Sequence, residues 1–322
     1  MRRAVPGASA VWSRGRSSTP LGFGGASIAN LFTSVTDDEA HAAVQAAWDA
    51  GIRFFDTAPH YGLGLGKRRL GAALRTLPRE EYVVTTKVGR VLEPLPAQGR
   101  DTQGFDVPAD ARRVWDFSAD GFRRSLEASL DRLGLDRVDV VLIHDPDEHE
   151  DAAFSEAYPA LERLRGEGVV RAIGAGMNQS AMLTRFVRET DVDLVLWAGR
   201  YTVLDRSAAS DLLPAAQDRE VPVIAAGVYN SGLLASERPA NGMTYDYAAA
   251  PAGVVERAQR LARVCERHGV PLPTAALQFP LRHPAVASVL VGMRTADEVT
   301  RNTAALEQPL PDALWDDLAP LP

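Results

Sequence analysis

Four polar residues of this chain have the types and spacing expected of a proton-transfer site. Asp56, Lys87 and His144 each stand at the end of a short apolar run, and Tyr61 follows Asp56 in the next connecting segment. A free phenol titrates near ~10, so an adjacent ammonium helps it to exchange a proton at neutral pH. The set suits general acid–base catalysis at a carbonyl or alcohol carbon that exchanges hydride with a nicotinamide.

Each of these four residues has an expected role in that chemistry. Tyr61 would carry the proton, Lys87 would supply the cation, and Asp56 would pair with Lys87 and offset its burial. His144 would orient the substrate oxygen. Taken singly, the aspartate could cap a helix, the lysine could be solvated and the histidine could belong to the core. Their joint placement at strand ends favours the catalytic interpretation.

The elements that must position these residues form a regular alternation. Eight β-branched or aliphatic runs predict strands, at 21–26, 52–56, 82–87, 138–144, 170–174, 194–197, 221–227 and 286–292. The intervening patterns predict helices at 37–50, 66–76, 118–134, 150–167, 179–189, 207–219, 254–269 and 296–305. Eight such repeats indicate an α/β fold closed into a (β/α)8 TIM barrel, in which catalytic groups lie at the C-terminal ends of the strands.

Length and composition are compatible with one barrel domain. The chain has 322 residues, of which 46% are hydrophobic. We expect a flexible N-terminal segment over 1–19 and a single barrel over 20–322. The first segment is basic, but its apolar stretch is too short for a secretory signal, which predicts a cytoplasmic protein. The single cysteine, Cys265, is predicted to be a small buried hydrophobe rather than a reactive thiol.

Several classes of partner are disfavoured by the same data. A net charge of -7 argues against a general binder of nucleic acid, which would need a basic surface. No run approaches the ~18 apolar residues of a membrane helix. The six histidines show no spacing with cysteine or carboxylates that resembles a metal site. A small molecule is therefore the expected substrate.

Two segments are longer than ordinary connections. Residues 89–117 and 228–253 are predicted to be loops over the C-terminal face of the barrel that shape a substrate pocket, with a disordered surface insertion as the alternative. The glycines of 62–66 lack the spacing and strand context of a dinucleotide-binding motif. They are interpreted as a flexible turn on the substrate side.

The motifs around these residues resemble a known family. The matching segments are Asp56-Thr57-Ala58, Tyr61-Gly62, Arg69-Leu70-Gly71, Thr86-Lys87-Val88, the run 125–134 and Ile143-His144. Together they resemble the aldo-keto reductases over about residues 20–305. The resemblance implies a nicotinamide-dependent oxidoreductase in which Asp56, Tyr61, Lys87 and His144 are the catalytic residues.

Four further segments narrow the resemblance to one branch of the family. They are 144–147, 174–178, 198–205 and 227–232. They look like the sugar 1-dehydrogenases that act on L-fucose, L-galactose and related D-threo-aldoses, a branch that includes pyridoxal 4-dehydrogenase. The resemblance implies oxidation of the C1 hydroxyl of an aldose to the lactone. Oxidation of pyridoxal, reduction of small aldehydes and a cofactor-binding regulatory subunit without turnover are the alternatives.

The resemblance also implies where the cofactor is held, across the C-terminal face. Gly24 and Gly25 would lie beneath the nicotinamide ribose, and Asn178 would bond the carboxamide. The pyrophosphate would be wrapped by Gly227, Val228, Tyr229, Ser231 and Gly232. The adenosine end would be met by Gly292, Arg294, Glu298 and Asn302.

Three positions depart from the wider family pattern. Ala198 stands where a glutamine usually contacts the carboxamide, and Ala226 stands where an aromatic residue usually stacks on the nicotinamide. Arg200 or Tyr229 could substitute for them. Glu298 falls where NADP-selective members often carry a cation, and a carboxylate there would repel a 2′-phosphate. The cofactor is therefore expected to be NAD or NADP, with NAD preferred.

Overall fold

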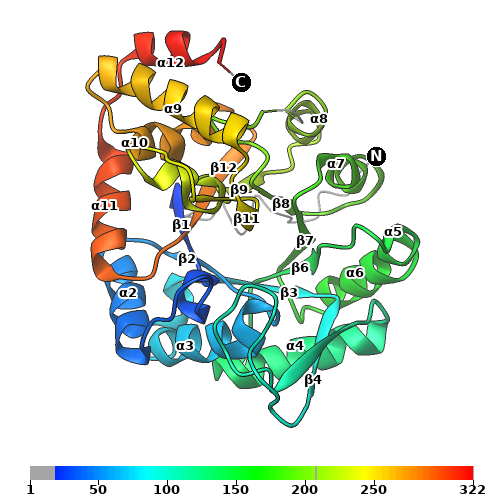
Figure 1. The fold of residues 1–322 in the computed structure, drawn as a ribbon. Helices are drawn as coiled ribbons and strands as arrows, with labels where there is room; N and C mark the ends of the chain where they lie inside the picture. The colour runs from blue at the N-terminus through cyan, green and yellow to red at the C-terminus, as the bar shows by residue number, and fades with distance from the viewer. Residues whose placement is uncertain (1–18, 207–208, 322) are drawn as a thin grey trace.

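The computed structural model describes residues 19–206 and 209–321, and eight parallel strands close into a barrel that helices surround (Figure 1). The order around the barrel is β1-β12-β9-β8-β7-β6-β3-β2. The strands are β1 (Leu21–Gly24), β2 (Phe54–Asp56), β3 (Val83–Val88), β6 (Val140–His144), β7 (Ala172–Met177), β8 (Leu194–Ala198), β9 (Val223–Ala226) and β12 (Val286–Gly292). The predicted TIM barrel is confirmed. The predicted flexible segment 1–19 lies almost wholly outside the described residues.

The strands are apolar on both sides because one side fills the barrel and the other packs under helices. The interior is filled by a layer of buried aliphatic and aromatic side chains, among them Phe54, Leu142, Leu196 and Leu290. Neighbouring strands leave no room for a side chain at one position of the barrel. A Cβ on Gly174 would lie 2.0 Å from the carbonyl oxygen of Leu194, so this position of β7 requires glycine.

Eleven α-helices over the described residues belong to the outer layer or its connections. They are α2 (Asp37–Asp49), α3 (Leu65–Leu74), α4 (Ala119–Leu133), α5 (Glu150–Ala152), α6 (Tyr158–Gly166), α7 (Ser180–Glu189), α8 (Leu212–Asp218), α9 (Ala252–Arg267), α10 (Leu272–Gln278), α11 (Ala296–Glu307) and α12 (Asp312–Leu318). Their starts follow local rules. For example, Thr36 and Glu39 form a reciprocal capping box at the start of α2.

Predicted and observed helices differ in four places. The predicted helix 150–167 is interrupted by a π-helical segment, Ala153–Ala157, between α5 and α6. Of the predicted helix 207–219, residues 207 and 208 lie outside the described part, and α8 begins only at Leu212. Two helices were not predicted, namely α10 and α12 (Asp312–Leu318), because each spans only seven residues and shows little periodicity.

The two long segments contain regular structure. The segment 89–117 includes an antiparallel hairpin of β4 (Arg90–Pro94) and β5 (Ala111–Trp115). The segment 228–253 contains a 3-10 turn, Asn230–Ala235, and a short hairpin of β10 (Thr244–Tyr245) and β11 (Ala248–Ala249). Both segments are therefore long connections, as predicted, and each contains a short hairpin. None of the described helices is both long and apolar enough to cross a membrane.

Candidate active site

Asp56, Tyr61 and Lys87 meet at the C-terminal ends of neighbouring strands. Asp56 ends β2, Lys87 lies in β3 and Tyr61 begins the 3-10 turn Tyr61–Gly64. The Lys87 Nζ lies 2.6 Å from Asp56 Oδ2 and donates to Tyr61 Oη at 2.9 Å. A third bond, at 3.3 Å, runs to the carbonyl oxygen of Thr57. All three N–H groups of the ammonium are therefore used, and one of them donates to the phenol oxygen.

His144 completes the group from β6. Its ring centroid lies 6.1 Å from that of Tyr61 at 87°, an edge-to-face arrangement. Its Nε2 lies 3.4 Å from Asp145 Oδ2. All four residues predicted to be catalytic are therefore brought together by the barrel.

The turn that carries Tyr61 is built by backbone geometry. Gly62, Leu63 and Gly64 all have positive φ, and a Cβ on Gly62 would lie 2.5 Å from the carbonyl oxygen of Ala29. Gly62, Leu63 and Gly64 are buried, and α3 begins directly after them. The interpretation of 62–66 as a flexible turn was therefore wrong, because this segment packs against Ala29 and fixes the phenol.

Burial dominates the electrostatics of the triad. It raises the pKa of the Tyr61 phenol well above its usual value, and the Asp56 carboxylate raises it further, while Arg90 opposes the change. Burial also raises the pKa of Asp56, against the lowering influence of Lys87. The protein alone therefore holds Tyr61 as a neutral phenol, ready to donate its proton to a substrate oxygen.

Both histidines at the site are neutral. Burial lowers the pKa of His144 well below its usual value, with Arg90 and Lys87 adding to the effect. Burial and the cations Arg90 and Arg113 lower the pKa of His60 to about 2. Each neutral imidazole has one N–H donor and one acceptor nitrogen, so His144 can act as a hydrogen-bond donor without a net charge.

A second lysine lies behind the site. Lys67, on α3, is fully buried and donates to the Thr86 hydroxyl, next to Lys87 in β3. Burial lowers its pKa well below the usual value, and the ammonium of Lys87 lowers it further. The sequence contains no other lysines, so every lysine of the chain is buried here. Lys67 was not identified from the sequence, since its helix gives no sign that this position faces the barrel.

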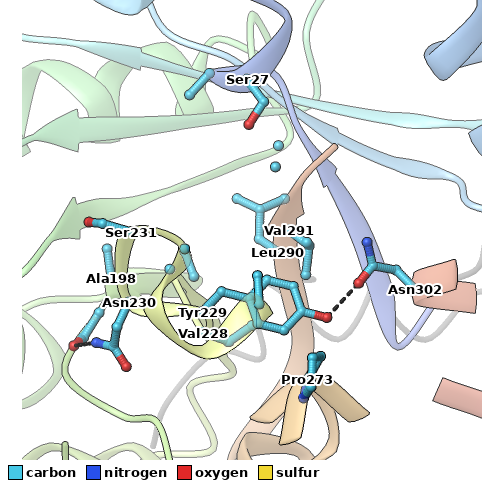
Figure 2. Close-up of a pocket in the computed structure, with 18 of the residues that line it drawn as sticks. Ser27, Ala198, Val228, Tyr229, Asn230, Ser231, Pro273, Leu290, Val291 and Asn302 are labelled. Atoms are coloured by element: carbon cyan, nitrogen blue, oxygen red, sulfur yellow. Dashed lines mark hydrogen bonds between the residues drawn. The ribbon is translucent and has the colours of Figure 1, made fainter. Parts of the chain in front are cut away.

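A cleft of about 920 Å³ opens beside Asp56 and Tyr61 and runs across the C-terminal ends of the strands (Figure 2). Most of the predicted cofactor residues line it. They are Gly24, Asn178, Gly227, Val228, Tyr229, Ser231, Gly232, Gly292, Arg294, Glu298 and Asn302. Gly25 does not, because its N–H bonds the carbonyl oxygen of Asp56 and its Cα packs on that strand.

Two glycines allow close approach of the backbone segments that form the cleft. A Cβ on Gly292 would lie 2.2 Å from the Ser27 hydroxyl oxygen, and one on Gly227 would lie 3.0 Å from the Gly199 nitrogen. Ser27 and Gly199 also line the cleft. Glycine at these two positions therefore allows the chain segments that line the cleft to pack closely against each other.

The far end of the cleft is organised by α11. The Tyr229 hydroxyl donates to Asn302 Oδ1, as Figure 2 shows, and the Asn302 amide donates to the carbonyl oxygen of Glu298. The Glu298 carboxylate accepts from the Arg294 backbone N–H at 2.7 Å and from its guanidinium at 2.9 Å. The charge of Arg294 is thus already paired with a carboxylate.

The suggested substitutes for Ala198 and Ala226 both line the cleft, and the polar group of each has a hydrogen-bond partner there. Tyr229 reaches Asn302, and the Arg200 guanidinium pairs with Asp246 at 2.8 Å. Asn178 instead bonds the carbonyl oxygen of Ala198 at 3.1 Å.

The part of the chain that the structure describes holds no cluster of three or more histidine, cysteine or acidic residues that could bind a metal ion. Cys265 is buried on α9, and burial raises the pKa of its thiol to about 11, as expected for an unreactive position.

Comparison with known proteins identifies the family. Residues 20–321 match the aldo/keto reductase family along nearly the whole barrel. The chain belongs to the aldo/keto reductase family. It is an NAD(P)-dependent oxidoreductase.

Three relatives of this aldo/keto reductase are curated proteins. A D-threo-aldose 1-dehydrogenase from Pseudomonas sp is 51% identical over 93% of this chain and 92% of its own length. A pyridoxal 4-dehydrogenase from Microbacterium luteolum is 38% identical, covering 96% and 95%. An L-galactose dehydrogenase from Arabidopsis thaliana is 33% identical, covering 93% and 88%.

Solved structures agree with the fold of this aldo/keto reductase. A holo form of an aldo-keto reductase from Bacillus halodurans superposes with a TM-score of 0.72 at 26% identity, over 94% of this chain and 91% of that chain. A glycerol dehydrogenase from Gluconobacter oxydans gives a TM-score of 0.73 at 24% identity, over 94% and 92%. The latter likeness concerns the barrel alone.

Proposed function

We propose that this aldo/keto reductase oxidises the C1 hydroxyl of an aldose to the corresponding lactone. One observation carries the proposal. The Lys87 ammonium bonds both Asp56 and Tyr61, at 2.6 Å and 2.9 Å, at the end of a cleft that can hold a dinucleotide. The substrate class is taken from the relative with 51% identity, a D-threo-aldose 1-dehydrogenase. L-fucose, L-galactose and D-arabinose are the expected substrates.

The residues divide the work as follows. Tyr61 exchanges a proton with the C1 oxygen, and Lys87 stabilises the phenolate that accepts this proton. The neutral imidazole of His144 positions the same oxygen. A bound oxidised nicotinamide would accept hydride from C1. Asp56 holds the ammonium of Lys87 and offsets the cost of burying it.

We assign the cleft to the cofactor, with the nicotinamide end at Asp56 and Tyr61. Gly24 and Asn178 would contact that end, the backbone of 227–232 would wrap the pyrophosphate, and α11 would receive the adenosine. Gly25 would support the site through its bond to Asp56 rather than touch the cofactor.

We further propose that NAD is preferred over NADP. The Glu298 carboxylate lies at the adenosine end and holds the Arg294 guanidinium, so a 2′-phosphate would meet a negative charge whose partner cation is already paired. A ribose 2′-hydroxyl could instead donate to the carboxylate. We expect a higher kcat/KM with NAD, and a tenfold advantage for NADP would contradict this assignment.

A charge-removing variant sharpens the cofactor experiment. Glu298→Gln should raise kcat/KM for NADP relative to NAD, because the repulsive charge is lost and Arg294 is released. Glu307→Gln, at the exposed end of the same helix, is the matched control and should leave the ratio unchanged. An unchanged ratio in Glu298→Gln would mean that this carboxylate does not select the cofactor.

A substrate panel tests the reaction itself. Reduced cofactor is followed by its absorbance with L-fucose, L-galactose, D-arabinose and pyridoxal in turn. We expect turnover with at least one aldose and a lactone as its product. Turnover with pyridoxal alone would overturn the proposal.

Pyridoxal is the second candidate because one relative, at 38% identity, is a pyridoxal 4-dehydrogenase. An aromatic substrate would need stacking partners. Trp197 and Tyr201 stack on each other with ring centroids 5.7 Å apart, but both are buried and neither lines the cleft. Phe32 and Tyr247, with ring centroids 6.2 Å apart at the cleft, are the better candidates.

A further inference from the structure

An ion pair lies beside the catalytic group, and no step of the proposed reaction uses it. The Arg90 guanidinium donates to Asp145 Oδ2 at 2.7 Å. Arg90 begins β4, just after β3, and Asp145 directly follows His144. Neither residue is among those that line the large cleft, although Tyr61 and Asp56 are. The pair therefore lies beside the imidazole of His144 and outside the lining of the cleft that we assign to the cofactor.

The position of this pair is fixed from both sides. The Arg90 guanidinium lies over the Trp115 ring, 4.5 Å from its centroid. Asp145 has a φ of 44°, an unusual conformation for a residue other than glycine, and its N–H bonds the carbonyl oxygen of Gly176. Backbone strain of this kind persists where the surrounding structure enforces it and is frequent at functional sites.

Stability alone is a weak explanation for the pair. The side chains of Arg90 and Asp145 are 13% and 29% exposed. An ion pair so far withdrawn from water contributes little net stability, because desolvation of the two charges offsets their attraction. In addition, not every polar atom of the pair has a hydrogen-bond partner. Within the described residues Arg90 makes this one side-chain hydrogen bond, and its buried Nε has no partner.

The arrangement offers an acceptor and a donor side by side, next to the histidine that would hold the C1 oxygen. The Asp145 oxygen that accepts from Arg90 is also 3.4 Å from His144 Nε2. A carboxylate beside a guanidinium matches two neighbouring hydroxyl groups, one of which donates while the other accepts. Adjacent hydroxyls distinguish an aldose from a simple aldehyde.

We propose that Arg90 and Asp145 are specificity-determining residues that recognise the hydroxyl groups next to C1 of an aldose. The assignment rests on the proposed function and specifies the part of the sugar that the enzyme recognises. Asp145 accepts from one hydroxyl, and Arg90 donates to its neighbour. A polar site of this kind rejects a substrate that lacks the hydroxyl, because its own groups would then stay unpaired.

The experiment compares an accepted aldose with its 2-deoxy form and with methylglyoxal, which has no hydroxyl group and is assayed in the direction of reduction. Arg90→Met and Asp145→Asn are measured beside Arg112→Met. Arg112 pairs with Glu93 on the same hairpin, is well exposed, and serves as the matched control. Thermal melting and cofactor binding by fluorescence titration establish that each variant is folded.

We expect Arg90→Met to lower kcat/KM for the full aldose by about 100-fold, mainly through KM, and to change kcat/KM for methylglyoxal less than threefold. The preference for the aldose over its 2-deoxy form should shrink in both variants and persist in Arg112→Met. Equal losses on every substrate would overturn the inference, since they indicate that the pair only positions His144. An unchanged preference would overturn it as well.

Failure of the proposed function gives a different result. Wild-type protein that reduces methylglyoxal but oxidises no aldose would contradict the proposed function and, with it, this inference. Wild-type protein that oxidises aldoses, with variants that lose all substrates in parallel, would contradict the inference alone.

Discussion

At the scale of single residues, the phenol of Tyr61 is the centre of the site. Its oxygen accepts a hydrogen bond from the Lys87 ammonium, and its ring packs edge-to-face with the ring of His144. Its raised pKa makes it a proton donor in the protein alone, so oxidation requires this proton to leave first. The hydrogen bond from the Lys87 ammonium stabilises the phenolate and so lowers the free-energy cost of this deprotonation in a buried position.

Replacement of Tyr61 by phenylalanine tests this role. The variant keeps the ring, and with it the packing against Phe105, but loses the oxygen that exchanges the proton. We expect kcat to fall by about 10²- to 10⁴-fold while cofactor affinity changes little. Steady-state kinetics and a fluorescence titration of the cofactor measure the two effects, and more than a tenth of the wild-type rate would contradict the assignment.

Lys67 provides a prediction about stability and pH. Its pKa is lowered in the folded state, so the unfolded chain binds more protons between that pKa and about 10.4, and stability rises with pH across this interval. Lys67→Met removes the buried amine. We expect a higher free energy of unfolding near pH 7, by about 1 kcal/mol after loss of the bond to Thr86, and a gain that shrinks as the pH approaches 10.

Thermal or urea unfolding of Lys67→Met at several pH values measures this trend. Arg68→Met is the matched control, because Arg68 is the exposed neighbour and its replacement removes the same charge. The control should show no such dependence on pH. A Lys67→Met protein that is less stable than wild type at pH 7 would show that the hydroxyl bond outweighs the cost of burial.

At the scale of elements, the alternation of short apolar runs and amphipathic segments predicted all eight barrel strands. The reason is physical, since strands buried on both sides are continuous apolar runs and the helices over them need one apolar stripe. The β4–β5 hairpin was not predicted, because its exposed residues, such as Arg112, interrupt any apolar pattern. The seven-residue helices α10 and α12 are too short to show a period.

Close packing between elements gives a further prediction. A Cβ on Gly71 of α3 would lie 2.0 Å from the carbonyl oxygen of Leu133 in α4. Gly71→Ala must therefore separate the two helices, and we expect a loss of about 2 kcal/mol or more in stability. Gly253→Ala, in the first turn of α9 with no atom within 4 Å, is the control and should be neutral or slightly stabilising. Equal melting temperatures of the two variants would contradict the packing argument.

At the scale of the whole molecule, closure of the barrel brings together side chains whose contacts cannot be predicted from local sequence. The types and strand-end positions of Asp56, Lys87 and His144 could be predicted, because parallel strands deliver their ends to one face. The partnership of Arg90 with Asp145 could not. It depends on how the hairpin after β3 folds back over β6, and distances of this kind arise only in the closed structure.

Since both lysines of this chain are buried, its described surface presents arginine as its basic residue and carries no side-chain amine. Amine-reactive esters applied to the native protein should spare residues 67 and 87, and mass spectrometry of the digested protein would show both acylated only after unfolding. Coupling through side-chain amines, a routine way to attach dyes or resins, would thus serve as a readout of denaturation for this enzyme.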